Sequence, residues 1–377
     1  MVRPLGAHRY GVSPSDRLGV PPSGSWGRAE GARRCRKGER AQGARAAMDM
    51  RLRRVGDRAR STVDSDWSAP EANRASKKRG IPLSISVSDL VTVRSRHPEA
   101  IAEAAARRVR RPLIGDSGRL MIVAADHPAR GSLAVGGHKL AMANRVDLLE
   151  RLCMALSRPG VDGVLATADI LEDLLLLGAL DGKVVMGSMN RGGLAGASFE
   201  LDDRFTGHRP QDIERLRFDA GKLLLRIDYE DAGSLTTMVT AARAIDDMAE
   251  RRLPVFVEPF ISRRTGGKVV NDLSAEAVTK SIAIASGLAG TSAYTWLKVP
   301  VTEDADEMAA VMETSTLPAV LLGGDVGKSP QDQEEAYEKW RKALGLPTVQ
   351  GLVVGRSLLY PAEGSVETAV DTAVGLL

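Results

Sequence analysis

Short apolar runs alternate with helical segments eight times along this sequence, and this alternation constrains the fold more than any other feature. The runs have the length of buried strands rather than of helices. We predict strands at 120–125, 163–167, 183–187, 222–227, 254–258, 294–298, 319–323 and 351–355. Amphipathic or apolar helical segments follow the strands at 146–157, 169–178, 210–217, 234–251, 274–287, 303–313, 332–344 and 365–376.

The character of these strands favours a closed barrel. Strands that are apolar throughout are typical of parallel sheets covered by helices. Eight strand–helix units within residues 118–377 match the size of a (β/α)8 barrel, the TIM-barrel fold. The alternative is a doubly wound open sheet, which normally has a glycine-rich phosphate loop after its first strand. The segment 126–131, Asp-His-Pro-Ala-Arg-Gly, is not such a loop. We therefore predict the α/β barrel over 118–377.

Two different segments precede the predicted barrel. Residues 1–80 contain 19 Lys+Arg and 8 Asp+Glu, whereas the rest of the chain contains 33 and 40. This basic part is rich in Arg, Gly, Ser and Pro without apolar periodicity, so we expect a disordered leader over 1–83. Met48 and Met50 lie inside it, which leaves an over-extended start codon as an alternative. A helical lead-in is expected over 84–117, with Ser88 as an N-cap.

The composition argues against several classes of protein. The basic leader lacks the interleaved aromatic residues and the amphipathic face that would favour a nucleic-acid or membrane partner. No stretch approaches the about 20 unbroken apolar residues of a membrane helix. The two cysteines, Cys35 and Cys153, provide neither a disulfide framework nor a zinc-ligand spacing. We expect a cytoplasmic protein that binds neither nucleic acid nor a membrane.

A lysine at the end of the sixth predicted strand is the main candidate for chemistry. Lys298 closes the apolar run 294–298, and a buried ammonium is costly without a partner or a task. Desolvation lowers a lysine pKa and frees the amine to attack a carbonyl. A structural ion pair or a side chain that reaches solvent is the alternative. Because neighbouring strands lie about 4.8 Å apart, we expect Glu258, at the end of strand 5, to move protons for Lys298.

Further polar residues lie at the carboxyl ends of the strands, where barrel active sites form. Asp126 ends strand 1 and is expected either to share the proton transfer or to cap the following loop. His127 beside it and Arg226 on strand 4 are candidate substrate-binding residues, with Arg226 suited to a carboxylate or a second anion. The same ends carry Thr167, Asp169, Ser188, Asn190 and Asp228.

The last two strand ends predict a phosphate site. Gly323 and Gly324 follow strand 7, and Gly355 and Arg356 follow strand 8, where many barrels bind phosphate. Glycines permit close approach of backbone N–H groups, and a guanidinium matches phosphate oxygens. The segment after strand 3, 188–209, is a candidate lid or substrate-binding loop, with a disordered surface excursion as the alternative.

These segments resemble the class I, Schiff-base aldolases of the deoxyribose-phosphate, fructose-bisphosphate and tagatose-bisphosphate aldolase superfamily. The resemblance covers about residues 118–376. Trp-Leu-Lys-Val-Pro-Val at 296–301 and Phe-Val-Glu-Pro at 256–259 are similar to the lysine and glutamate segments of the tagatose-bisphosphate aldolases. Ala-Ala-Asp-His at 124–127 is similar to the strand-1 segment of the archaeal-type fructose-bisphosphate aldolases. The two glycine-rich strand ends resemble the superfamily's phosphate site. Deoxyribose-phosphate aldolase has a second lysine on strand 7, which 321–324 lack.

The resemblance implies a homo-oligomeric carbon–carbon lyase of carbohydrate metabolism, similar to aldolase-like proteins of inositol catabolism. Its substrate would be a phosphorylated keto-sugar or keto-deoxy sugar acid, such as 6-phospho-5-dehydro-2-deoxygluconate, or a fructose or tagatose bisphosphate. No metal or cofactor is required, because the iminium replaces the Lewis acid of a zinc aldolase. Two alternatives stay open. One is a metal-independent sugar-phosphate isomerase or lyase that uses Asp126 and Glu258 without a covalent intermediate. The other is a non-catalytic metabolite-binding barrel.

Overall fold

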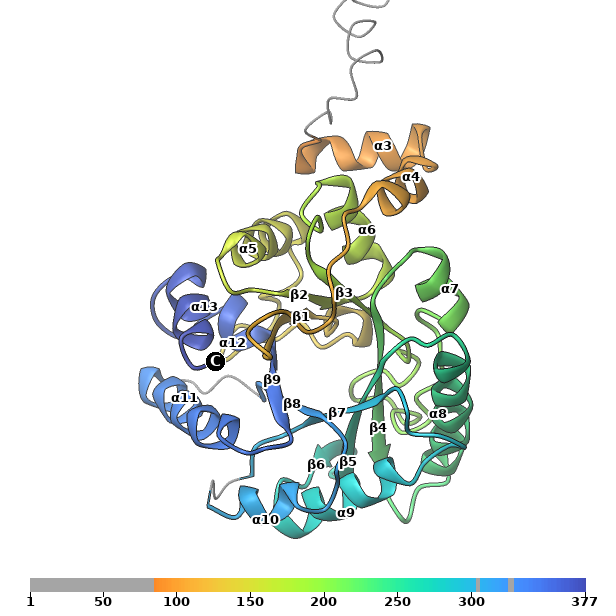
Figure 1. Ribbon diagram of the computed structural model, residues 1–377, viewed down its shortest axis with the longest axis vertical. Helices are drawn as coiled ribbons and strands as arrows, with labels where there is room; N and C mark the ends of the chain where they lie inside the picture. Colours follow the sequence, from red (N-terminus) through yellow and green to blue (C-terminus); the bar gives the residue numbers. More distant parts are fainter. Residues whose placement is uncertain (1–84, 303–305, 325–328) are drawn as a thin grey trace, which may run out of the picture. The chain divides into compact units, whose positions relative to one another are not determined.

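The computed structural model describes residues 85–302, 306–324 and 329–377. Eight parallel strands form a ring in the order β4-β3-β2-β1-β9-β8-β7-β5, and pairing of β4 with β5 closes it (Figure 1). The predicted (β/α)8 barrel is therefore confirmed. Its strands are β1 (Leu120–Ala125), β2 (Gly163–Ala166), β3 (Val184–Ser188), β4 (Ala220–Ile227), β5 (Val255–Thr265), β7 (Thr295–Val299), β8 (Ala319–Leu322) and β9 (Val349–Val354).

Helices surround the ring of strands (Figure 1). They are α5 (Arg145–Ser157), α6 (Ala168–Leu176), α7 (Pro210–Arg215), α8 (Gly233–Glu250), α9 (Ala275–Ser286), α10 (Met308–Met312), α11 (Pro330–Leu344), α12 (Arg356–Leu359) and α13 (Val366–Val374). Asn144, Ser274 and Ser365 begin their helices because their side chains accept backbone N–H groups of the first turn. In the described part of the chain, no helix has both the length and the apolar character needed to cross a bilayer.

The core has an inner and an outer part. Every second strand residue points into the barrel, and the inner cluster consists of Leu120, Ile122, Ala124, Leu165, Val184, Met186, Ala220, Phe256, Val320 and Val353. The rings of Phe256 and Trp296 stack with their centroids 5.2 Å apart. A larger outer cluster lies between the strands and the helices. Because apolar side chains fill the barrel interior, charged side chains on the inner face mark a specialised region.

The lead-in contributes helices and part of the barrel core. It contains the 3-10 turn η1 (Val87–Asp89), α3 (Leu90–Arg96) and α4 (Ala100–Arg107). The N-cap of the first turn is Ser86, so the prediction of Ser88 is wrong. Ser86 takes this place because its backbone N–H reaches the carboxylate of Asp89 at 3.0 Å. The predicted disordered leader, 1–83, lies outside the described residues.

An antiparallel hairpin extends strand 5 beyond the predicted end at residue 258. β5 continues to Thr265, and the chain returns through Gly266 and Gly267 into β6 (Lys268–Asn271). Both glycines have positive φ, 57° and 80°, as a two-residue hairpin turn requires. The prediction ended before Pro259 because proline lacks a donor for the strand ladder. The proline is tolerated because the pairing of β5 with β7 stops at Val257.

Candidate active site

The barrel brings Lys298 of β7 and Glu258 of β5 into contact. The Lys298 ammonium Nζ donates to Oε1 of Glu258. Both residues are buried, with 5% and 8% of their surface exposed. Such a pair is costly to bury unless both partners are satisfied, so its position on the inner face of a barrel needs a chemical explanation.

A second lysine, Lys222 of β4, completes this group. Its Nζ contacts Oε2 of Glu258 and lies 3.3 Å from Oδ2 of Asp126. Glu258 therefore bridges two buried ammonium groups. The sequence prediction missed Lys222 because it began the fourth strand at this residue and searched the opposite end. β4 begins at Ala220, so Lys222 lies inside the strand, on the inner face that Ala220 shares.

Asp126 follows β1 and accepts hydrogen bonds from three sides. Besides Lys222, the guanidinium of Arg191 donates to Oδ2, and the hydroxyl of Ser188 lies 3.2 Å from the same oxygen. Arg191 Nε also donates to Ser188 Oγ at 2.8 Å. Arg191 is a second residue that the prediction missed as part of the site, since it stands in a glycine-rich segment typical of a flexible loop.

Charge complementarity keeps both carboxylates ionised. Burial by itself would raise the pKa of Glu258, but Lys222 and Lys298 lower it to about 2. Burial likewise opposes ionisation of Asp126, yet Arg191 and Lys222 hold the pKa of its carboxyl well below the usual range. Burial lowers the pKa of Lys222, against the opposing effect of Asp126 and Glu258. The site is thus an array of alternating charges shielded from water.

His127 extends this array toward the end of β9. Its Nδ1 lies 3.7 Å from Oδ1 of Asp126. Burial lowers the pKa of His127 to about 3; the carboxylate of Asp126 acts against this, and the positive charges of Arg356 and Lys298 reinforce it. The imidazole is therefore neutral at pH 7, and the cation at the end of β9 is near enough to influence the group around Asp126.

The ends of β8 and β9 lie close together, as a shared ligand site would require. A Cβ on Gly355 would come within 2.2 Å of the carbonyl oxygen of Ala124, and one on Gly323 would meet Val354 Cγ1 at 2.6 Å. Gly324 has a φ of 65°. The hydroxyl of Ser357 is buried and lacks a hydrogen-bond partner among the described residues. Residues 325–328 of the predicted phosphate loop lie outside the described part.

Arg226 is near the barrel mouth but contacts a protein carboxylate. Its guanidinium donates to the carboxylate of Glu200 at 2.6 Å and to the Glu200 carbonyl at 2.9 Å. Glu200 belongs to the long segment after β3. The predicted anion-binding arginine is therefore already paired within the chain.

The remaining polar residues at the strand ends have local roles. Thr167 donates to Asp169 at 2.6 Å at the start of α6. The side-chain amide of Asn190 exchanges two hydrogen bonds with the backbone of Leu224, which fastens the end of β3 to β4. The carboxylate of Asp228 accepts the backbone N–H of Arg264 at 3.2 Å. Helix starts and loop anchoring account for these residues.

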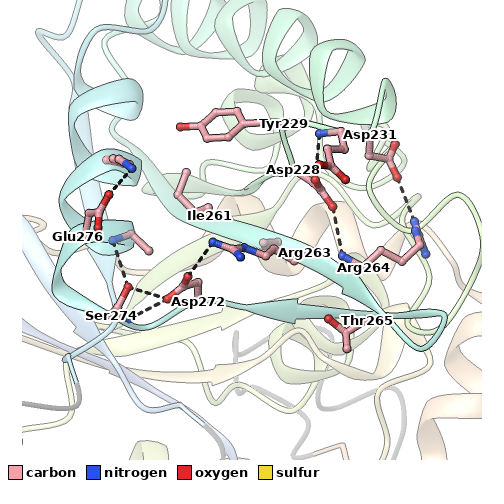
Figure 2. A pocket seen from close by; sticks show the side chains of 14 residues that line it. Asp228, Tyr229, Asp231, Ile261, Arg263, Arg264, Thr265, Asp272, Ser274 and Glu276 are labelled. Atoms are coloured by element: carbon pink, nitrogen blue, oxygen red, sulfur yellow. Dashed lines mark hydrogen bonds and ion pairs between the residues drawn. The ribbon is translucent and has the colours of Figure 1, made fainter.

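A polar pocket of about 680 Å³ lies beside the β5–β6 hairpin and is separate from this array (Figure 2). Its lining includes Asp228, Arg263, Asp272 and Lys280, and neither Lys298 nor Glu258 belongs to it. Arg263 faces Asp272 across it at 3.7 Å. Among the described residues, no group of three or more His, Cys, Asp and Glu side chains is arranged to hold a metal ion.

Solved structures of Schiff-base aldolases share this barrel. A Schiff base-forming fructose-1,6-bisphosphate aldolase is 20% identical with a TM-score of 0.52, and the match covers 73% of this chain and 99% of that chain. An archaeal fructose-1,6-bisphosphate aldolase, with its catalytic lysine bound to the carbinolamine intermediate, is 20% identical with a TM-score of 0.50, over 73% and 97%. The protein is thus a (β/α)8 barrel with the fold of these class I aldolases.

Among proteins with this fold, the chain belongs to the Cgl0159-like family, whose model matches residues 118–374. The crystal structure of Cgl0159 from Corynebacterium glutamicum is 50% identical to it with a TM-score of 0.73, and the match covers 78% of this chain and 98% of that chain. No curated protein sequence matches the chain.

Proposed function

We propose that this protein is a class I aldolase that cleaves a phosphorylated keto-sugar through a Schiff base on Lys298. The observation that carries the proposal is the buried contact between Lys298 and Glu258, together with Lys222 and Asp126 on the same inner face. A barrel that needed only stability would gain little from burying two ammonium groups and two carboxylates, because desolvation offsets most of their attraction. The shared fold of Schiff-base aldolases supports the same chemistry.

The reaction would begin as the Lys298 ammonium gives a proton to Glu258 and the resulting amine attacks the substrate ketone. The C–N bond forms as the carbonyl electrons move to oxygen, and loss of water gives the iminium. The bond between the carbons α and β to the iminium then breaks as a base removes the proton of the β-hydroxyl, and the electrons of the broken bond move toward the iminium nitrogen to form an enamine. Protonation of the enamine carbon and hydrolysis release the second product and restore the amine.

Glu258 is suited to the proton transfers because its basicity depends on Lys298. While both lysines are charged, the pKa of Glu258 stays at about 2, and the carboxylate is a weak base. The carbinolamine nitrogen is uncharged, so its formation removes one of the two cations and raises the pKa of Glu258. Glu258 can then hold a proton and deliver it to the carbinolamine hydroxyl, which leaves as water. Enolisation without a covalent intermediate would leave both lysines charged. The dependence of Glu258 on the charge of Lys298 therefore favours the aldolase over the isomerase alternative.

The strand ends around Gly323, Gly324, Gly355 and Arg356 would bind one substrate phosphate. The hydroxyl of Ser357 beside them, which has no hydrogen-bond partner among the residues that the structure describes, supplies a further donor for a phosphate oxygen. The candidate substrates are 6-phospho-5-dehydro-2-deoxygluconate from inositol catabolism and the ketose bisphosphates. Each also carries an anion at its far end, which Arg226 would have to bind. A homo-oligomeric, cytoplasmic enzyme without a metal or cofactor fits this proposal.

Borohydride trapping tests the mechanism. Reduction in the presence of a ketose phosphate should add the mass of the reduced substrate to the peptide that contains Lys298, and Lys298→Arg should abolish both the adduct and turnover. Lys222 is a second candidate nucleophile, because burial lowers its pKa. Peptide mapping separates the two lysines, and Lys222→Arg serves as the matched variant.

Two results would refute the proposal. Turnover without any borohydride-trapped adduct, retained by Lys298→Ala, would favour the isomerase or lyase that uses Asp126 and Glu258. Binding of sugar phosphates without turnover or adduct would favour a metabolite-binding barrel.

A further inference from the structure

Arg226 lies on the same inner face of β4 as Lys222, closer to the mouth of the barrel. The two residues are four positions apart, which corresponds to about 13 Å along a parallel strand. If the reacting carbonyl of a substrate lies at the lysines, Arg226 faces the end of the substrate that extends toward the mouth. The chemistry at Arg226 therefore determines which substituent that end carries.

A carboxylate of the chain already occupies the binding face of Arg226. Glu200 accepts from Arg226 through its side chain at 2.6 Å and through its carbonyl at 2.9 Å. The Glu200 carboxylate also lies 3.7 Å from the guanidinium of Arg130, which forms an ion pair with Asp203. All four residues are at least nine-tenths buried. Two arginines face two carboxylates, so the positive charges of this group are balanced and none is left over to bind an anionic ligand.

The segment that carries Glu200 is fastened from several directions. The backbone N–H of Asp203 donates to Thr237 Oγ1 of α8 at 3.0 Å, and that hydroxyl donates to the carbonyl of Leu201 at 2.7 Å. Arg264 of the β5–β6 hairpin reaches the Ser198 carbonyl at 3.0 Å, and Figure 2 shows the same guanidinium facing Asp231. Glu200 is therefore held in place by the fold.

We propose that Glu200 is an internal counter-ion that fills the place of a distal substrate anion, so that the protein selects keto-sugar phosphates whose far end is uncharged. This specificity rests on the proposed aldolase function, and it disfavours the substrates named there, because 6-phospho-5-dehydro-2-deoxygluconate carries a carboxylate and a ketose bisphosphate carries a second phosphate at the far end. A second phosphate or a carboxylate at the far end would have to displace Glu200, which would leave a buried carboxylate unpaired and close to the incoming anion. A hydroxyl group at that end meets no such penalty.

Phosphate binding tests the counter-ion without reference to catalysis. Isothermal titration of the full-length protein with inorganic phosphate should show one more binding site in Glu200→Gln than in the wild type, because the amide is isosteric but uncharged. Asp202→Asn, on the same segment but paired with Arg204 near the surface, should leave the wild-type stoichiometry unchanged. An unchanged stoichiometry in Glu200→Gln would refute the inference.

Kinetics with two probes tests the specificity. The wild type should cleave fructose 1-phosphate with a higher kcat/KM than fructose 1,6-bisphosphate, and Glu200→Gln should shift this ratio toward the bisphosphate by about tenfold, the value of one charge-assisted contact. Arg226→Gln covers the case in which Glu200→Gln does not fold. It should lower kcat/KM for both probes alike, whereas a selective loss for the bisphosphate would show that Arg226 binds the distal phosphate.

The two proposals fail in different ways. A borohydride adduct at Lys298 together with an unchanged probe ratio in Glu200→Gln would overturn only the counter-ion. An additional phosphate site in Glu200→Gln without any adduct in the wild type would overturn only the Schiff-base mechanism.

Discussion

At the scale of single residues, one glutamate determines the electrostatics of the inner face. Glu258 contacts both Lys222 and Lys298, so its removal leaves two buried ammonium groups with one fewer anion. We expect Glu258→Gln to lower the free energy of unfolding by about 3–5 kcal/mol, as for other broken buried pairs. Urea denaturation followed by tryptophan fluorescence measures the change.

A matched control separates burial from the loss of an ion pair. Glu276 pairs with Lys280 on the surface of α9 with most of its side chain exposed, so Glu276→Gln should cause no measurable change. Equal stability of wild type and Glu258→Gln would mean that the two lysines are not both charged in the folded protein.

The neutral state of His127 predicts a loss of stability in acid. Its pKa is lowered from 6.5 to about 3, so between these values the unfolded chain binds a proton that the folded chain does not. As the pH is lowered through this range, the free energy of unfolding therefore decreases by up to about 1.4 kcal/mol per pH unit because of this group. The lowered pKa values of Asp126 and Glu258 act in the same direction, but only below about pH 4.5, near the ordinary carboxyl values.

Denaturation between pH 5 and 7 isolates the histidine. We expect His127→Gln to reduce the pH dependence in this range by about 1–2 kcal/mol. Buried His208, whose pKa burial also lowers, keeps part of the dependence in this variant. The exposed His97 provides a control, since His97→Gln should behave as the wild type. The same pH dependence in wild type and His127→Gln would contradict the proposed neutral imidazole.

The success of the sequence prediction also differs from residue to residue. Lys298, Glu258 and Asp126 stand at strand ends, where the barrel rule directs attention, and the structure brings them together. Lys222 stands inside a strand. It is separated from Arg226 by an even number of positions, so that both side chains lie on one face of the strand, and this spacing was the signal that could have identified Lys222. The pairing of Arg226 with Glu200 depends on a segment without periodicity, so no sequence pattern indicated it.

At the scale of elements, the segment after β3 is shaped by close backbone contacts. The sequence left two alternatives for this segment, a lid or substrate-binding loop and a disordered surface excursion. The structure shows a folded segment. A Cβ on Gly193 would come within 2.2 Å of the Glu200 carbonyl oxygen and 3.0 Å of Asp203 Cβ. Real Cβ atoms do not approach this closely, so an alanine there must displace the part of the chain that carries Glu200.

We therefore expect Gly193→Ala to lower the free energy of unfolding by about 1–3 kcal/mol, as overpacking does elsewhere, and to expose the segment to proteases. Urea denaturation and limited proteolysis with mass spectrometry measure the two effects. Gly137→Ala is the control, because a Cβ at Gly137 meets nothing within 4 Å. Equal cleavage rates in both variants would show that the contact at Gly193 does not hold the segment.

The hairpin of β5 and β6 shows why some elements were missed. Apolar periodicity finds buried strands, but Arg263, Arg264 and the exposed β6 carry little apolar surface. The Gly266-Gly267 pair was a usable turn signal. In contrast, all eight barrel strands were predicted, because burial on both faces imposes a continuous apolar run on each of them.

At the scale of the whole molecule, the lead-in belongs to the folded barrel domain, although the family model matches only from residue 118 onward. Leu113 and Ile114 pack against the inner core cluster. Arg108 is buried, donates to the Lys183 carbonyl at 2.8 Å and pairs with Asp219 at 3.0 Å. These contacts connect the lead-in to β3 and β4, the strand that carries Lys222.

Two truncations test whether the barrel depends on this lead-in. Because the sequence predicts a disordered leader over 1–83, we expect its deletion to change the free energy of unfolding by no more than about 0.4 kcal/mol and kcat/KM by no more than about twofold. Deletion of 1–117 uncovers the inner cluster and leaves the Asp219 carboxylate without Arg108, and should cost at least about 3 kcal/mol. Urea denaturation and light scattering on both proteins provide the measurement. A change in assembly or activity after the shorter deletion would assign a role to the leader, and equal stability after the longer one would show that the barrel folds without its lead-in.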